Sequence, residues 1–167
     1  MDTVTFQGSP LRLDGEQPAR GAKAPDFELL ATNLTKRTLK DYLGKILVLL
    51  SVPSLDTPVC DTEVRRFNKE AAGLSDKVRI VAASCDLPFA QVRWCGATGI
   101  TAVETLSDHK ETSFGRNYGV LIKELRLLAR AVFVVSPDGT LAYSRIVPEI
   151  TNEPDYDEVL DAVRKLL

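Results

Sequence analysis

The sequence is poor in the residues from which metal sites and cysteine–histidine hydrolase sites are built. It has one histidine, His109, and three cysteines, Cys60, Cys85 and Cys95. No two cysteines have the C-x-x-C spacing of a dithiol redox motif, and one histidine leaves a zinc site or a cysteine–histidine pair poorly supplied. We therefore expect no metal and no cofactor, and we expect His109, which lies in a polar stretch, to be exposed.

The sequence has neither a large net charge nor a long apolar run. The 21 basic and 23 acidic side chains leave a formal net charge of -2, which offers no basic surface for a nucleic acid. No run approaches the ~20 apolar residues of a membrane span, and residues 1–6 lack the features of a secretory signal. Three cysteines are too few for a disulfide scaffold. We therefore expect a cytoplasmic protein that binds neither nucleic acid nor membrane.

What the sequence does contain is the pattern of one α/β domain. Hydrophobic residues make up 44% and charged residues 26% of the 167 positions, which fits one core spanning residues 1–167. The main predicted elements are a strand at 46–52, a helix at 58–74, a strand at 78–84, strands at 131–136 and 140–147, and a helix from 155 onward. This β-α-β unit followed by a β-β-α unit predicts a thioredoxin-like fold, with a mixed central sheet flanked by helices.

Outside these units, residues 3–13 alternate around a Gly-Ser-Pro turn and predict an amino-terminal β-hairpin, which we expect to lie apart from the main pattern. Residues 121–128 mix apolar and basic side chains. Their pattern does not decide between a helix and a loop.

The insert between the two units begins with a second helix signal. Pro88 suits a first helical position and Gly96 suits a C-cap, so Cys95 is expected in the last turn of this helix. A helix of about two turns is marginal without tertiary support and can unwind at low cost.

The most informative stretch is residues 53–60, Pro-Ser-Leu-Asp-Thr-Pro-Val-Cys. Thr57 is expected as a hydroxyl N-cap and Pro58 as the first helical residue, which makes Cys60 the third. The free N–H groups and the positive end of a helix favour the thiolate, which is the nucleophilic form of cysteine. The alternative is that Cys60 is an inert hydrophobic residue, the first of the apolar residues on the core-facing side of the helix. The charged residues of this helix, including Glu63, are expected outside that side.

Thr57 and Arg130 narrow the chemistry that such a thiolate can do. The Thr57 hydroxyl, three positions before Cys60, can donate to the thiolate and accept from an incoming hydroxyl group. A peroxide needs this pairing, together with a fixed donor for the charge that develops on the leaving oxygen. Arg130, just before an apolar strand, offers a permanent cation. Its alternative role is an arginine at a strand end with its head group in solvent.

Two motifs resemble a known family. Pro53-x-x-x-Thr57-x-x-Cys60 matches the active-site pattern of the peroxiredoxins. Together with Asp86-Leu-Pro-Phe-Ala-Gln-x-Arg-x-Cys95, it resembles the Tpx-type thiol peroxidases, an atypical 2-Cys group. The similarity continues through residues 128–131 and 149–156 and covers nearly the whole chain.

The resemblance implies a role for each of these residues. Cys60 is then the peroxidatic cysteine, Pro53 shields it from water, and Thr57 and Arg130 bind and polarise the peroxide. Cys95 is the resolving cysteine, which forms an intramolecular disulfide with Cys60. The implied enzyme is a homodimeric peroxidase of antioxidant defence and redox homeostasis, which reduces hydrogen peroxide and alkyl or lipid hydroperoxides and is recycled by thioredoxin.

Three alternatives stay open at this point. Cys85 is either a buried inert thiol or a competitor of Cys95 for the oxidised Cys60. The protein is either a peroxidase or a peroxide-sensing thiol switch with little turnover, because the two share their first chemical step. A thioredoxin-fold binding module with inert thiols is the non-enzymatic alternative.

Overall fold

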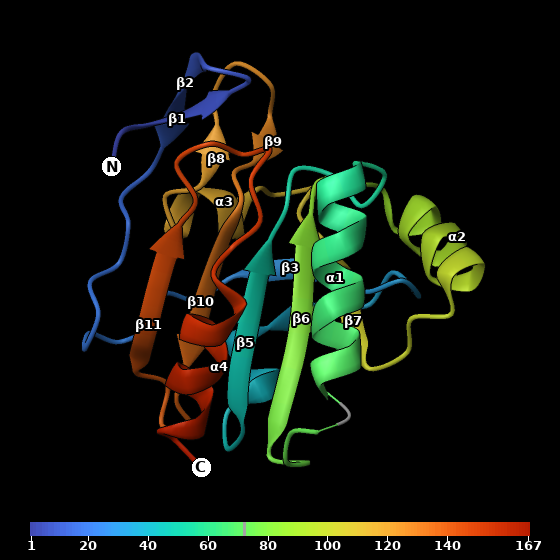
Figure 1. Cartoon of the computed structure of the whole chain (residues 1–167), viewed down its shortest axis with the longest axis vertical. Coiled ribbons are helices and arrows are strands. Elements are labelled where there is room, and N and C mark those ends of the chain that lie inside the picture. The colour runs from blue at the N-terminus through green and yellow to red at the C-terminus, as the bar shows by residue number, and fades with distance from the viewer. Residues whose placement is uncertain (72) are drawn as a thin grey trace.

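A seven-stranded mixed sheet forms the centre of the protein (Figure 1), seen in a computed structural model that describes residues 1–71 and 73–167. Its strands are β3 (Glu28–Leu30), β4 (Lys36–Thr38), β5 (Ile46–Ser51), β6 (Val78–Ser84), β7 (Val103–Ser107), β10 (Ala131–Val135) and β11 (Leu141–Ile146). They lie in the order β11-β10-β5-β6-β7-β3-β4, with β5, β6 and β7 parallel and the other neighbours antiparallel. This confirms the expected thioredoxin-like α/β fold.

Helices cover both faces of this sheet (Figure 1). They are the short 3-10 helix η1 (Leu39–Tyr42), α1 (Pro58–Ala71), α2 (Pro88–Thr98), α3 (Ser113–Asn117) and α4 (Tyr156–Arg164). Because β5 is buried on both faces, Leu47 and Leu49 join the core with α3, whereas Val48 and Leu50 join the core with α1 and α4. Among the described residues, no helix combines the length and apolarity that crossing a membrane requires.

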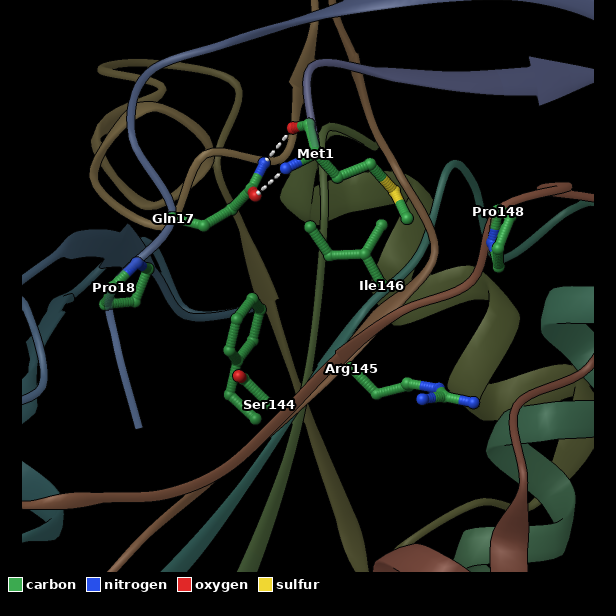
Figure 2. A pocket seen from close by; sticks show the side chains of 8 residues that line it. Met1, Gln17, Pro18, Ser144, Arg145, Ile146 and Pro148 are labelled. Atoms are coloured by element: carbon green, nitrogen blue, oxygen red, sulfur yellow. Dashed lines mark hydrogen bonds between the residues drawn. The ribbon is translucent and has the colours of Figure 1, made fainter. Parts of the chain in front are cut away.

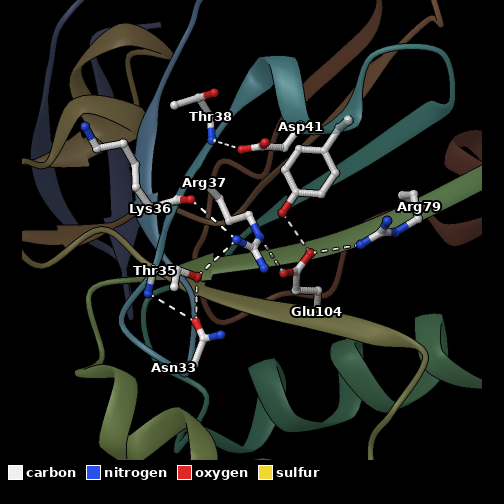
Figure 3. A network of polar contacts seen from close by, with 9 residues as sticks. Asn33, Thr35, Lys36, Arg37, Thr38, Asp41, Arg79 and Glu104 are labelled. Atoms are coloured by element: carbon white, nitrogen blue, oxygen red, sulfur yellow. Dashed lines mark hydrogen bonds and ion pairs between the residues drawn. The ribbon is translucent and has the colours of Figure 1, made fainter.

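Strand β7 was not predicted, because it contains Glu104 and other polar side chains. The structure explains how this strand is accommodated beside β6 (Figure 3). Glu104 accepts a hydrogen bond from the Tyr42 hydroxyl at 2.7 Å and forms ion pairs with Arg79 at 3.1 Å and Arg37 at 3.5 Å. These partners come from η1, β6 and β4, so the strand depends on contacts that are distant in the sequence.

The amino-terminal hairpin forms as predicted and lies outside the central sheet, but it pairs with other strands. A second, four-stranded sheet contains β1 (Thr3–Phe6), β2 (Ser9–Asp14), β8 (Leu121–Ile122) and β9 (Leu127–Leu128), in that order. Residues 121–128, which the sequence left undecided, are therefore two short strands and a turn, in which Arg126 has a positive φ of 55°. The hairpin finds its partner in these strands because neither pair is stable alone.

Glu149 anchors the tip of the hairpin to the carboxyl-terminal segment. Its carboxylate accepts hydrogen bonds from the backbone N–H of Gln7 at 3.2 Å and of Gly8 at 2.9 Å, and from the Thr5 hydroxyl at 2.9 Å. Hydrogen bonds from Thr151, and then those from Gly8 and Thr5, lower the pKa of Glu149 to about 2. Anchoring at this point places the hairpin tip beside the end of β5, where the candidate site lies.

Helix α2 is longer than the sequence indicated. It continues through Gly96 and ends at Gly99, which has a φ of 72° and whose N–H bonds to the Cys95 carbonyl at 2.9 Å. The expected end at Gly96 is therefore wrong, but Cys95 does lie in the last turn, because its carbonyl accepts the closing bond from Gly99. Gly99 ends the helix because it adopts the left-handed conformation that glycine tolerates without a steric penalty.

Candidate active site

The loop after β5 delivers Cys60 to the amino terminus of α1. The Thr57 hydroxyl accepts a hydrogen bond from the Cys60 N–H at 3.2 Å and donates one to the Ser54 carbonyl at 3.1 Å. The predicted N-cap is confirmed, and it fixes Cys60 as the third helical residue. In this state the Thr57 hydroxyl donates to Ser54, not to sulfur, so it has to rotate to donate to a bound molecule.

Arg130 reaches the same place from a distant part of the chain. Because β10 runs antiparallel to β5, with Ala131 opposite Ser51, the residue before β10 lies at the carboxyl end of β5. Arg130 is only 1% exposed, and its Nε donates to the Ile150 carbonyl at 2.8 Å. The alternative of a head group in solvent is therefore wrong.

The charge of Arg130 is balanced inside the protein. Its guanidinium donates to the Glu63 carboxylate at 2.6 Å. Burial lowers the pKa of Arg130, but its interactions with Cys60 and Glu63 raise it by more, so the net direction is upward. Arg130 thus remains a cation beside Cys60, in a position to stabilise negative charge on sulfur or on a nearby oxygen.

Glu63 is a functional residue that the sequence analysis missed. The helical periodicity places it away from the core-facing stripe, but its side chain is fully buried, and within the described part of the chain its Oε1 has no hydrogen-bond partner. Burial raises its pKa from 4.5 to about 7, although Arg130 opposes this shift. Its spacing could have indicated this position, because Glu63 lies three residues after Cys60 and residues three apart are neighbours on a helix.

The raised pKa of Glu63 gives a testable pH dependence. Its contribution to stability is full below about pH 4.5 and is lost as the pH rises to about 7, since the folded protein keeps a proton that the unfolded chain releases earlier. The isosteric Glu63→Gln variant lacks this titration. Urea denaturation of both reduced proteins at several pH values in this window should show a steeper decline for wild type. Equal slopes contradict the assignment.

A small cavity opens beside these residues. It has a volume of about 240 Å³ and is lined by Phe6, Gln7, Pro53, Thr57, Pro58, Val59, Arg130, Ile150 and Thr151. Three expected site residues, Pro53, Thr57 and Arg130, therefore meet at one cavity, next to the fully buried Cys60. The hairpin tip contributes Phe6 and Gln7, which the sequence analysis did not connect with the site.

A larger cavity near β11 has a different character (Figure 2). Its volume is about 370 Å³, and its lining is Met1, Gln17, Pro18, Phe133, Ser144, Arg145, Ile146 and Pro148. No cysteine is among these residues, and Met1 and Gln17 bond to each other there. The smaller cavity is therefore the better candidate for the active site, because Cys60 lies beside it. His109 is exposed, as expected, and lines neither cavity.

Cys95 lies on a different helix from Cys60. All three cysteines are free thiols, and the half-buried Cys95 has its sulfur 3.6 Å from the Thr105 hydroxyl. Its neighbour Trp94 donates to the Asp61 carboxylate at 3.1 Å, which attaches α2 to α1 one residue after Cys60. Both helices are intact around these residues.

Cys85 has the environment of an inert thiol. It follows β6, is packed partly against the core, and has its pKa raised to about 12 by burial and by the Asp108 and Asp86 carboxylates. A thiol with so high a pKa supplies almost no thiolate at neutral pH.

We therefore expect Cys85→Ala to consume peroxide within about twofold of the wild-type rate, because a substitution away from the reacting groups has a small effect. Peptide mass spectrometry of the peroxide-treated wild type should show Cys85 unpaired. A Cys60–Cys85 disulfide as the main product contradicts this prediction.

The comparisons with known proteins cover the whole chain. A family model described as Redoxin matches residues 19–160. A curated protein of Bacillus subtilis named thiol peroxidase is 50% identical over 167 residues, which is 100% of this chain and 99% of that protein. A thiol peroxidase of Oceanobacillus iheyensis is 51% identical over 165 residues, which is 99% of this chain and 100% of that protein.

A solved structure is similar to this chain over its whole length. The crystal structure of a peroxiredoxin-like protein from Aquifex aeolicus superposes with a TM-score of 0.93 and 39% sequence identity. The superposition covers 100% of this chain and 98% of the other. The similarity in fold therefore extends to the amino-terminal hairpin and to both cysteine-bearing helices.

Proposed function

This chain belongs to the redoxin family and, within it, to the thiol peroxidases; on that premise we propose that Cys60 is the residue that attacks the peroxide and Cys95 the residue that resolves the product. The protein is thus a thiol-dependent peroxidase. The observation that carries the assignment of Cys60 is its burial at the start of α1, next to the buried cation of Arg130 and to a cavity.

In the first step, the Cys60 thiolate attacks the terminal oxygen of a hydroperoxide. A sulfur–oxygen bond forms, the O–O bond breaks, and the leaving oxygen takes up a proton to become water or an alcohol. Cys60 is oxidised to a sulfenic acid. Arg130 stabilises the charge that develops on the leaving oxygen, and the Thr57 hydroxyl rotates to position the peroxide.

In the second step, the Cys95 thiol attacks the sulfur of the Cys60 sulfenic acid. A disulfide forms, and the hydroxyl of the sulfenic acid leaves as water. Because a disulfide requires Cα atoms within about 7 Å, the first turn of α1 or the part of α2 around Cys95 must unwind. Pro53 keeps water from Cys60 until then, since it is buried and lines the cavity.

The substrates, the reductant, the cellular location and the oligomeric state complete the proposed function. The apolar lining from Phe6, Val59 and Ile150 supports organic hydroperoxides as substrates besides hydrogen peroxide. A dithiol protein, thioredoxin, returns two electrons by thiol–disulfide exchange. We place the protein in the cytoplasm, where reducing conditions keep thiols free. We also propose a single domain over residues 1–167 and a homodimer, which analytical ultracentrifugation tests.

The proposed function is tested by turnover. With thioredoxin, its reductase and NADPH, the protein should consume many equivalents of hydrogen peroxide and of an organic hydroperoxide. The measurement is NADPH oxidation at limiting enzyme concentration. A single stoichiometric oxidation followed by arrest contradicts this function and favours a peroxide-sensing switch.

The role of Cys95 is tested separately. In Cys95→Ser, the first oxidation should proceed at the wild-type rate, because Cys95 does not touch the peroxide, whereas turnover with thioredoxin should fall to the background rate. Trp94 fluorescence should show one phase in place of two. A variant that still forms a Cys60 disulfide within the same chain contradicts this assignment.

A further inference from the structure

Asp86 joins the loop that precedes Cys60 to the end of β6. Its Oδ1 accepts a hydrogen bond from the Ser54 hydroxyl at 2.7 Å. Its Oδ2 accepts one from the Leu55 N–H at 2.8 Å and another from the Ser84 hydroxyl at 2.8 Å. The position of the loop that leads into α1 is thus set by a carboxylate outside the cavity.

The same cluster holds α2. Gln91, on the buried face of α2, donates through Nε2 to the Ser84 hydroxyl at 3.0 Å and to the Leu106 carbonyl at 2.9 Å. Three hydrogen bonds, through Asp86 and Ser84, therefore connect Leu55 of the Cys60 loop with the helix that carries Cys95. Such a network is strong because its charged acceptor is partly shielded from water.

The outer face of α2 is open to solvent. Its N-cap, Leu87, provides no side-chain cap, and Leu87, Phe89 and Val92 are 54%, 70% and 49% exposed. On the inner side, Trp94 adds the bond to Asp61 described above. The Asp86 network and the Trp94 bond both lead to residues close to Cys60 in the sequence, whereas Gln91 and Cys95 also contact β7. Disturbing the segment around Cys60 therefore removes part of the support of α2.

We propose that Asp86 is a positioning residue that couples the two cysteine-bearing segments, so that unwinding around Cys60 releases α2 and Cys95 together. The proposal rests on the roles given above to Cys60 and Cys95. While Asp86 holds both segments, Cys60 stays at the start of the intact α1, next to the cavity lined by Pro53, Thr57 and Arg130. Once the coupled segments open, both thiols become free to meet, which shortens the time for which a sulfenic acid is exposed to further oxidation.

Hydrogen exchange of the reduced protein tests the coupling without any peroxide. Ser54→Ala removes one bond to Asp86 and leaves α2 itself unchanged. We expect amides of residues 91–98 to exchange about tenfold faster, since a hydrogen bond to a charged group is lost. Asp56→Asn, an exposed carboxylate of the same loop, is the control and should leave these amides unaffected. Faster exchange confined to residues 54–57 overturns the proposal.

Rapid kinetics provide the second test. In Asp86→Asn, one acceptor is lost, so the opened state gains population relative to the closed one. With Trp94 fluorescence as the readout, the peroxide phase should become slower and the disulfide phase faster. A variant with only lowered stability shows this in its denaturation midpoint, which is measured alongside. If the peroxide phase and the disulfide phase of the variant change in the same direction, or do not change, the proposed coupling is wrong. If wild type itself shows neither phase, the proposed function is wrong.

Discussion

Cys60→Ser is expected to reduce the rate of peroxide consumption by about 10⁴-fold or more, the scale on which removal of a catalytic nucleophile acts. The serine hydroxyl has nearly the same shape as the thiol but is not ionised at neutral pH, so the site keeps its geometry without its nucleophile. The measurement is steady-state turnover with thioredoxin, together with Trp94 fluorescence after rapid mixing with peroxide.

Two controls test whether the loss of activity is due to the Cys60 thiol itself. Cys85→Ala removes a free thiol that the site does not use, and it should retain both turnover and the fluorescence change. Circular dichroism should show that Cys60→Ser is folded, because the Thr57 cap bonds to the backbone N–H of residue 60 and not to its side chain. Turnover by Cys60→Ser at a rate near that of wild type contradicts the mechanism.

Arg130→Met is expected to slow the peroxide step by about 10²–10³-fold, since it removes a preorganised donor from the leaving oxygen. It should also destabilise the protein by about 3–5 kcal/mol, because Glu63 becomes a buried carboxylate without a counter-ion. The destabilisation should be largest above pH 7, where Glu63 is ionised. Stopped-flow kinetics and urea denaturation measure the two effects independently.

A double variant separates the two roles of Arg130. Arg130→Met combined with Glu63→Gln removes both members of the buried ion pair, so most of the lost stability should return, as it does when buried pairs are replaced together. The slow peroxide step should persist, because the neutral amide introduced at position 63 supplies no cation. Recovery of the rate along with the stability contradicts a direct role of Arg130 in the reaction.

Predictions that depend on neighbouring residues agreed with the structure. The Thr57 cap and Pro58 place Cys60 because the bond from the Cys60 N–H closes over three positions. Asp155 caps α4 in the same way, accepting from the Glu158 N–H at 3.0 Å. These bonds form within one helical turn, so the residue types and their spacing suffice to predict them.

Predictions that depend on distant partners were incomplete. The sequence pattern placed the end of α2 at Gly96, whereas the packed helix continues to Thr98 and is capped by Gly99. Strand β7 and residues 121–128 acquire their conformation from neighbours elsewhere in the chain. Local patterns carry little information about such segments, because their hydrogen bonds are formed across the sheets.

The residue pattern alone was enough to predict a cysteine at the start of a helix, its threonine cap, and a second cysteine on another helix. The folded chain was needed to show that Glu63 is buried against Arg130, that the amino-terminal hairpin lines the cavity, and that hydrogen bonds through Asp86 connect the two cysteine-bearing segments. The physical reason is that a charge can be buried only where a partner compensates it, and the partner of Glu63 lies 67 positions away in the chain.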